Sequence, residues 1–506
     1  MPDRVSDAKW SQLSQFIAQM MGLHFPPERS ADLQRGVAKA ARELGFEDTV
    51  TCVDQLLSVP PTDAQIEVLA SHLTVGETYF FREKKTFEVL AAEVLPEIIR
   101  SRRGREQRLR LWSAACCTGE EAYSLAILLR EALPDYAEWH VTITATDING
   151  RFLHKAAAGI YGEWSFRDRP ASFRESYFNR TPDGRYLIRP EIWKLVNFAR
   201  LNLVEDVYPS LATDTNAMDV IFCRNVLMYF TPPQVQSVIR KLHHALAEGG
   251  WLVVSPSEAS NALFPQFVTV NFPGVILYQK SETKLRARQS WMPSPLVESA
   301  TFVAHPFETS SPWTPQAPVA LPAEIAPAPP PQEPARPEML PTARALAETL
   351  YRQGRYAEAA DALVASLARC TPDPQAYSLL ARALANQGEL TDALAWCDRW
   401  IAAAKLDPAA HYVRAVVLLE RGEPESARAS FQRVLYLQPD FVLAHFALGN
   451  LARSEGRTEE ADRHFGNALR LLSRYQPGDA LPESEGLTAG RLTETITAMT
   501  ELETAP

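Results

Sequence analysis

The C-terminal part of the chain repeats itself every 34 residues. Four glycines and four alanines recur in phase at this interval: Gly354, Gly388, Gly422, Gly456, Ala359, Ala393, Ala427 and Ala461. Self-similarity at a fixed period of this length is typical of arrays in which short supersecondary units stack on one another. Small residues let two helices approach closely, and glycine suits the turn between them. The sequence therefore predicts a stack of about four helix pairs.

Thirty-four residues is the period of tetratricopeptide repeats, and residues 341–475 resemble about four of them. The resemblance implies an all-α superhelix whose concave groove binds a protein partner. We expect residues 476–506 to supply a capping helix and a tail. Residues 281–340 hold 13 of the 38 prolines and show almost no apolar periodicity, which predicts a disordered linker before the repeats.

Length and composition limit what the rest of the chain can be. A chain of 506 residues needs more than one hydrophobic core. Its net charge of -10 disfavours broad nucleic-acid binding. Six cysteines without CxxC or Cys/His spacing indicate neither a disulfide framework nor a metal site. With no signal segment and no apolar run of about 18 residues, we expect a cytoplasmic protein that would reach a membrane only by binding a partner.

Residues 1–75 are predicted to form a small helical domain. Apolar residues recur at helical spacing within 10–20, 33–44, 50–57 and 64–73. The second of these helices would carry Arg35, Lys39 and Arg42 on one face. That basic face is either simply solvated or docks against an acidic partner helix.

Between residues 109 and 280 strands and helices alternate, which is typical of a mostly parallel α/β sheet. Strands are predicted at 109–115, 140–147, 196–203, 218–225 and 251–254, with a closing antiparallel pair at 267–272 and 274–279. An aromatic-rich segment, about 160–200, reads as an inserted subdomain. In such sheets ligands bind beyond the carboxyl ends of the strands, so the segments that follow the first strands are candidate site elements.

Two of these segments carry acids. The turn after the first strand is Thr118-Gly119-Glu120-Glu121, with too few glycines for a phosphate loop. Its carboxylates either favour a cationic ligand or simply complement the helix dipole. Asp147, at the end of the second strand, suits a ribose diol because a carboxylate can accept hydrogen bonds from both hydroxyls.

An arginine follows two phenylalanines in Phe80-Phe81-Arg82. The segment is either a hinge whose rings belong to the core or a support that holds Arg82 as a fork for a ligand carboxylate.

Taken in order, residues 7–280 resemble the CheR-type chemotaxis-receptor glutamate methyltransferases, which use S-adenosylmethionine. The resemblance rests on five segments: Leu73-Thr-Val-Gly-Glu-Thr-Tyr-Phe-Phe-Arg82, Trp112-Ser-Ala-Ala-Cys-Cys-Thr-Gly-Glu-Glu121, Ala145-Thr-Asp-Ile148, Phe222-Cys-Arg-Asn-Val226 with Tyr229-Phe230, and Ser257-Glu258. It implies a Rossmann-like class I methyltransferase core over 76–280, with an all-helical N-terminal domain and a small β-subdomain.

The same resemblance implies which residues bind the cofactor: Thr78, Arg82, Glu120, Asp147, Asn202, Leu203, Arg224 and Asn225. Arg82 would bind the methionyl carboxylate, Glu120 the ammonium group and Asp147 the ribose. The amides of Asn202 and Asn225 would meet the adenine edge or nearby polar atoms. The product would be S-adenosylhomocysteine, and no metal is expected.

The implied acceptor is a glutamate carboxylate of a receptor. At pH 7 all but roughly 0.2% of an ordinary glutamate is ionised, so no general base is needed and positioning dominates catalysis. Arg82 and Tyr229 are therefore the catalytic candidates. The Tyr229 ring either orients the acceptor or packs structurally.

Three departures from the family pattern stand out. Gly76 replaces the usual Asn, Ser255-Pro256 replaces Gly-His, and Cys116-Cys117 replace small residues, either as fillers or as oxidisable thiols. These departures motivate an alternative, a methyltransferase-repeat scaffold with little or no activity. The resemblance also implies receptor contacts through the β-subdomain, and the basic face could meet acidic receptor helices.

Overall fold

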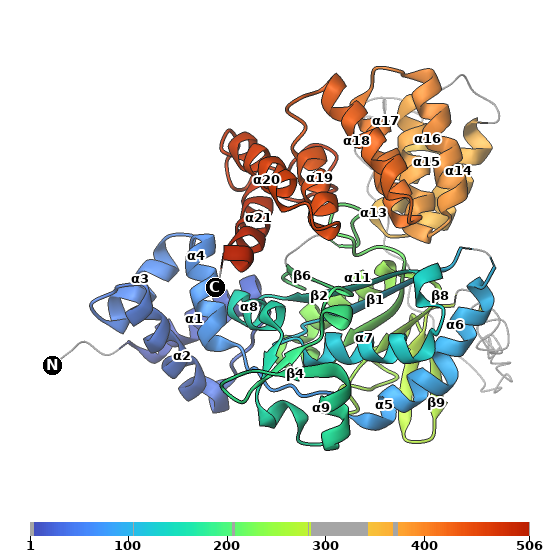
Figure 1. Cartoon of the computed structure of the whole chain (residues 1–506). Helices are drawn as coiled ribbons and strands as arrows, with labels where there is room; N and C mark the ends of the chain where they lie inside the picture. The colour runs from blue at the N-terminus through green and yellow to red at the C-terminus, as the bar shows by residue number, and fades with distance from the viewer. Residues whose placement is uncertain are drawn as a thin grey trace, which may run out of the picture.

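The computed structural model describes residues 5–104, 106–204, 208–281, 283–284, 343–367 and 373–504 (Figure 1). The linker predicted at 281–340 lies almost entirely outside the described residues. Three parts follow one another along the chain: N-terminal helices, a seven-stranded mixed sheet with its covering helices, and C-terminal helix pairs.

The N-terminal helices pack around their own core. They are α1 (Asp7–Met21), the short η1 (Pro27–Arg29), α2 (Ser30–Glu43), α3 (Thr49–Ser58) and α4 (Asp63–Leu73). Leu13, Ile17, Val37 and Leu69 are buried between them, as the helical spacing predicts. Thr62 begins α4 with a capping box, which satisfies two amide groups that a helix start leaves unpaired.

The sheet has the order β6-β2-β1-β7-β8-β10-β9. Its strands are β1 (Arg108–Ala114), β2 (His140–Asp147), β6 (Val196–Arg200), β7 (Met218–Cys223), β8 (Leu246–Val253), β9 (Val268–Phe272) and β10 (Val275–Gln279). The first five are parallel, and β10 pairs antiparallel with β8 and β9. The predicted parallel sheet with a closing antiparallel pair is confirmed.

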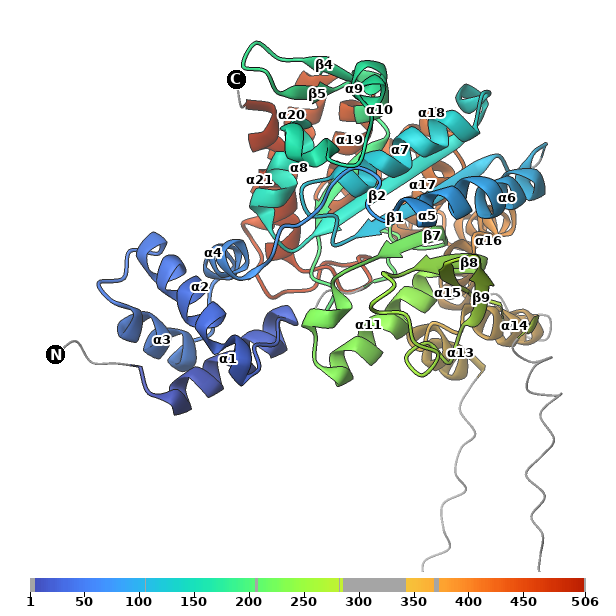
Figure 2. The same ribbon diagram turned by 90° about the horizontal axis from the view of Figure 1, so that it is seen from below.

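Each face of the sheet has its own core, because side chains alternate along a strand. Leu109 and Leu111 of β1 pack into the core shared with the helices of one face, and Trp112 and Ala114 pack into the other. The first face carries α5 (Lys84–Val89), η2 (Leu90–Val94), α6 (Leu95–Arg102) and α7 (Glu120–Ala132), and the second carries α11 (Pro232–Ala245). Figure 2 shows α7 and α11 on opposite sides of the strands.

The inserted segment forms a second, three-stranded sheet of order β3-β5-β4. Its strands are β3 (Ile160–Tyr161), β4 (Phe178–Arg180) and β5 (Tyr186–Ile188). The helix α8 (Gly150–Ala158) precedes the sheet, and the short helices η4 (Glu163–Phe166), α9 (Ala171–Tyr177) and α10 (Pro190–Trp193) lie between or after its strands. Phe80 is fully buried against it, with its ring stacked on Phe166 at 5.1 Å between centroids. The Phe80 ring therefore belongs to the core, which agrees with both interpretations of the Phe80-Phe81-Arg82 segment.

The C-terminal helices form four pairs. They are α13 (Ala343–Arg352), α14 (Tyr356–Leu367), α15 (Pro374–Gln387), α16 (Leu390–Ala403), α17 (Pro408–Glu420), α18 (Pro424–Leu437), α19 (Val442–Ser454) and α20 (Thr458–Leu472), followed by α21 (Ala489–Thr504). The four in-phase glycines lie at the turns between paired helices with φ between 71° and 85°, a region that side chains disfavour. The predicted repeat stack is confirmed.

The repeats dock on the amino ends of the central strands. A Cβ added to Gly388 would meet Arg108 at 2.8 Å, and one added to Gly422 would meet His140 at 3.2 Å. Arg108 and His140 are the first residues of β1 and β2. The repeat turns therefore abut the end of the sheet opposite to the one where ligands bind.

A buried ion cluster fixes this contact. Glu420 of α17 is 4% exposed, and its carboxylate accepts hydrogen bonds from Arg108 at 3.2 Å and from Asn216 at 2.9 Å. Arg110, a fully buried side chain, lies 3.7 Å from the same carboxylate and also pairs with Asp214 at 2.5 Å. Removing one charge from such a cluster leaves the others buried without compensation.

Among the described helices none is long and apolar enough to cross a membrane. The same residues contain no cluster of three or more His, Cys, Asp or Glu side chains that could hold a metal ion.

We predict that Glu420→Gln lowers the free energy of unfolding by about 3 kcal/mol, because two buried guanidinium groups lose their shared counter-charge. Urea unfolding of the full chain, followed by circular dichroism, measures this. Glu425→Gln on the adjacent α18 is the matched control: its side chain is 84% exposed, so a change within about 0.5 kcal/mol is expected. Equal urea midpoints for both variants would contradict the role given to Glu420.

Candidate functional site

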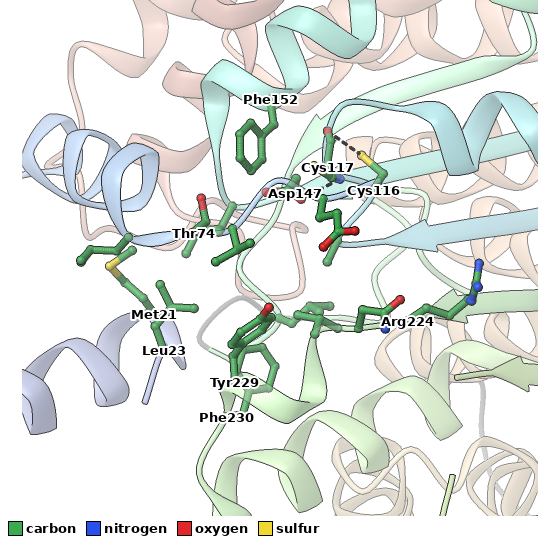
Figure 3. Close-up of a pocket in the computed structure, with 18 of the residues that line it drawn as sticks. Met21, Leu23, Thr74, Cys116, Cys117, Asp147, Phe152, Arg224, Tyr229 and Phe230 are labelled. Atoms are coloured by element: carbon green, nitrogen blue, oxygen red, sulfur yellow. Dashed lines mark hydrogen bonds between the residues drawn. The ribbon is translucent and has the colours of Figure 1, made fainter. Parts of the chain in front are cut away.

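A cavity opens at the carboxyl ends of β1, β2, β6 and β7 (Figure 3). The empty space within it, with its open mouth included, is about 1000 Å³. One wall comes from the sheet, one from the segment before α5, and one from the loop after α1 with Met21, Leu23 and Phe25.

Eight of the nine residues expected from sequence to bind cofactor or orient the acceptor line this cavity: Thr78, Arg82, Asp147, Asn202, Leu203, Arg224, Asn225 and Tyr229. They are spread along the chain from Thr78 to Tyr229, and the fold brings them together. Glu120 is the exception. Its carboxylate is buried outside the lining, where Thr118 donates to it at 2.6 Å and Ser165 at 2.9 Å.

Glu121 reaches the cavity in place of Glu120. The two residues begin α7, and successive helical residues point about 100° apart, so only one can face the strand ends. Ser113 donates to the Glu121 carboxylate at 2.7 Å, and Arg224 pairs with it at 3.0 Å. The motif contains both acids, and nothing in the sequence distinguished which one faces inward.

Arg82 offers a cation to the cavity. Its guanidinium donates to the Glu77 carbonyl at 2.6 Å and forms no ion pair with any residue that the structure describes. Phe81 and Glu83 on either side have φ of 58° and 63°, which non-glycine residues adopt only where the surroundings hold them. The Arg82 fork is therefore held in place and remains free to bind an external carboxylate.

Both terminal nitrogens of Arg224, by contrast, already have partners. Its side chain is 2% exposed, pairs with Glu83 at 2.7 Å and Glu121 at 3.0 Å, and donates to the Arg82 carbonyl at 2.8 Å. The guanidinium thus ties β7, α7 and the Arg82 segment together, and this arrangement fits a positioning role.

Asp147 ends β2 and faces the cavity (Figure 3). One carboxylate oxygen accepts from the Cys117 amide and the other from the Asn149 amide, each at 2.9 Å. Each oxygen keeps a further lone pair for a ligand hydroxyl. Burial raises the pKa of this carboxyl to about 6, although the backbone donors oppose the shift.

The N-terminal helices are fastened to the site by backbone contacts. The side-chain nitrogen of Asn202 donates to the Met20 carbonyl at 2.6 Å, and the side-chain oxygen accepts from the backbone amide of Val204 at 3.1 Å. The His24 amide donates to the Tyr229 carbonyl at 2.7 Å. Sequence reasoning missed this wall, since the loop after α1 carries no chemical motif.

Glu258, of the Ser257-Glu258 segment, supports the cavity wall. Its carboxylate accepts from the amides of Asn225 and Val226, each at 2.8 Å, and from the Ser255 hydroxyl at 2.6 Å. Asn225 has φ of 56°, so the carboxylate holds a strained residue at the cavity wall. Ser255, one of the departures, thereby supports Glu258.

Tyr229 is half-buried beside Phe230 and at the cavity wall (Figure 3). It ends the short η5 (Leu227–Tyr229), and the Arg29 guanidinium lies 5.4 Å from the centre of its ring. The ring also packs against the core of the N-terminal helices. The Tyr229 ring therefore packs against the N-terminal core and also lines the cavity.

Phe152 accounts for the glycine at position 76. A Cβ on Gly76 would lie 2.6 Å from the Phe152 ring, which itself lines the cavity. The ring therefore occupies the space where a side chain at position 76 would stand.

The two adjacent cysteines are buried loop residues. Burial raises the pKa of the Cys117 thiol to about 12 and the pKa of the Cys116 thiol well above its ordinary value, with the Asp147 charge adding to both shifts. Because the thiolate is the reactive form, these environments disfavour oxidation.

The basic face expected on α2 is exposed. Arg35 pairs with Asp32 on the same helix, Arg42 donates to the Ala38 carbonyl at 3.2 Å, and Lys39 points outward.

Comparison with known families assigns two regions. The family described as "CheR methyltransferase, SAM binding domain" matches residues 76–273. The family described as "Tetratricopeptide repeat" matches residues 344–408 and 412–470.

Two curated proteins illustrate the similarity. "Chemotaxis protein methyltransferase 2" of Vibrio cholerae is 36% identical over 268 residues, which cover 53% of this chain and 91% of that protein. "Chemotaxis protein methyltransferase 1" of Pseudomonas aeruginosa is 37% identical over 219 residues, covering 42% of this chain and 77% of that protein.

The raised pKa of Asp147 predicts a pH dependence of cofactor binding. The ionised carboxylate accepts from two hydroxyls and the protonated form does so poorly, so affinity for S-adenosylhomocysteine is constant above pH 7 and falls below about pH 6. Asp147→Asn is expected to bind about tenfold more weakly at pH 7.5, without this pH dependence. Calorimetric titrations from pH 5 to 8 test both. A wild-type affinity that stays constant to pH 5 would show that Asp147 does not contact the ligand.

Proposed function

Because the chain belongs to the CheR methyltransferase family, and is thus an S-adenosylmethionine-dependent protein-glutamate methyltransferase, we propose that it methylates glutamates on the cytoplasmic helices of a chemoreceptor. The observation that carries this proposal is a single cavity in which the unpaired Arg82 cation and the Asp147 carboxylate face the same space. Such a pair suits a ligand with an amino-acid end and a ribose.

The residues present fit the cofactor. In this proposal Arg82 binds the methionyl carboxylate and Asp147 the ribose hydroxyls, while Asn202, Leu203 and Asn225 hold the adenine. Glu121 is the acid that reaches the cavity and supplies the negative potential for the ammonium group, with buried Glu120 behind it. S-adenosylmethionine, when bound, supplies a methyl group on a sulfonium that a carboxylate oxygen can displace.

The chain's own contribution to catalysis is positioning. The acceptor glutamate is ionised at pH 7, so no residue needs to remove a proton. Arg82 and Asp147 hold the two ends of one ligand, Arg224 fixes Arg82, and Glu258 fixes Asn225. Tyr229 at the cavity wall orients the acceptor side chain. Fixing both reactants in this way replaces a bimolecular encounter with an oriented one.

The departures that motivated an inactive scaffold have local compensations. The Phe152 ring occupies the space beside Gly76, and Ser255 donates to Glu258. Arg82 and Asp147, which are proposed to bind the two ends of the cofactor, are both present and both line the cavity. We therefore favour an active enzyme.

We further propose a division of labour along the chain. Residues 1–75 and 76–280, including the β-subdomain, form the catalytic part, and the basic face of Arg35, Lys39 and Arg42 meets acidic receptor helices. The repeats bind a second protein and so recruit a cytoplasmic enzyme to receptor arrays.

Charge reversal of the basic face is expected to raise the KM for the receptor and to leave the affinity for S-adenosylhomocysteine unchanged. Equal shifts in both quantities would contradict the role proposed for the basic face.

Incubation with methyl-labelled S-adenosylmethionine and receptor-containing membranes tests the proposed reaction. Base-labile label on a receptor band is expected with the wild type. Arg82→Ala is expected to lose at least 100-fold in kcat/KM, because the ligand carboxylate loses a bidentate charged partner. Arg352→Ala, on an exposed repeat side chain, is the control. Receptor labelling retained by Arg82→Ala would remove Arg82 from the site, and no wild-type labelling would refute the proposed substrate.

A further inference from the structure

The first helices of the repeats hold a buried cation. The Arg382 side chain on α15 is 9% exposed, and its guanidinium pairs with two carboxylates, those of Glu483 and Glu485. The Tyr351 hydroxyl on α13 donates to the same Glu485 carboxylate. A carboxylate site is thus built from helices of two neighbouring repeats.

Both carboxylates belong to the chain's own tail, in the turn between α20 and α21. The Ser484 hydroxyl closes this turn on the carbonyls of Leu481 and Leu487, at 2.7 and 3.0 Å. Glu483 and Glu485 have φ of 62° and 57°, a conformation that residues with a Cβ rarely adopt. The tail therefore fits its site under backbone strain.

One polar atom of the site remains without a partner. Asn386 is 2% exposed, and its amide nitrogen donates to the Tyr351 hydroxyl at 2.8 Å and the Arg382 carbonyl at 3.1 Å. Its side-chain oxygen accepts no hydrogen bond from any described residue. A buried acceptor without a donor is costly, and a backbone N–H of an incoming peptide would satisfy it.

We propose that Arg382, Tyr351 and Asn386 form a binding site for an acidic segment of a protein partner, and that Glu483 and Glu485 are its internal occupant. The tail supplies the two carboxylates but leaves the Asn386 oxygen unpaired. A partner segment with two closely spaced acids and an unstrained backbone satisfies the whole site and displaces the tail. This inference concerns the repeats and does not depend on the methylation reaction.

Displacing the tail would also break a contact between the tail and the catalytic part. The Glu485 carboxylate also accepts from the amide of Leu211 at 3.1 Å, in the segment between β6 and β7. Leu211 is buried in the core of the repeats. A partner at Arg382 therefore removes one of the contacts that join the repeats to the sheet, while the Glu420 cluster remains.

The tethered tail competes strongly, since a short tether gives effective concentrations of the order of mM. The test therefore uses the full chain with Glu483→Gln and Glu485→Gln together, which empties the site of its charges. A fluorescent peptide of residues 478–489 is the probe. It is expected to bind this double variant at least tenfold more tightly than the wild type. The same peptide with both acids changed to Gln is expected not to bind.

Adding Arg382→Gln to the double variant is expected to abolish peptide binding, and adding Tyr351→Phe, which removes only the hydroxyl, to weaken it severalfold. Unchanged S-adenosylhomocysteine affinity and helical circular dichroism verify that each variant is folded. The proposal is overturned if the double variant binds the peptide no better than the wild type. Binding that survives both Arg382→Gln and Tyr351→Phe, or equal binding of the Gln peptide, overturns it as well.

Discussion

The buried guanidinium of Arg224 is the interaction on which the site depends. It lies at the end of β7 and meets the acid of α7, the acid before α5 and the carbonyl of Arg82. Three segments that are distant in sequence are thereby fixed around one charge that cannot be left unpaired. The Arg82 guanidinium stays available to a ligand because the neighbouring carboxylates of Glu83 and Glu121 pair with Arg224. In the proposed site the two arginines thus have different roles: Arg224 holds the segments together, and Arg82 is available to bind the ligand.

The repeats are integrated with the sheet and occupy its far end. Their turns meet the amino ends of β1 and β2, and the cavity opens at the carboxyl ends. The docked array therefore leaves the catalytic mouth accessible to a receptor. Its tail returns to the catalytic part a second time, where Glu494 of α21 pairs with Arg200 at the end of β6. Arg200 also donates to the carbonyl of Ile148, which lines the cavity, so the C-terminal helix is linked to the cavity wall through Arg200.

The elements and most of the site were predictable because they have local signals. Alternation along β1, the helical spacing of the N-terminal segments and the 34-residue period each follow from backbone geometry. The motif positions anticipated the residues that line the cavity, but Glu121 rather than Glu120 reaches it. The loop with Met21 and Leu23, the fit of Phe152 beside Gly76 and the tail contacts at Arg382 arise from packing between distant segments. Such contacts leave no periodic pattern in the sequence.

A crystal structure of the full chain with S-adenosylhomocysteine tests the central claim most directly. The account predicts the ligand in the cavity, with Arg82 within about 3 Å of its carboxylate and Asp147 within about 3 Å of both ribose hydroxyls. Arg224 should keep its contacts with Glu83 and Glu121. A ligand carboxylate bound to Arg224, with Arg82 turned away, would contradict the division of roles between the two arginines. A ribose that does not meet Asp147 would contradict the site itself.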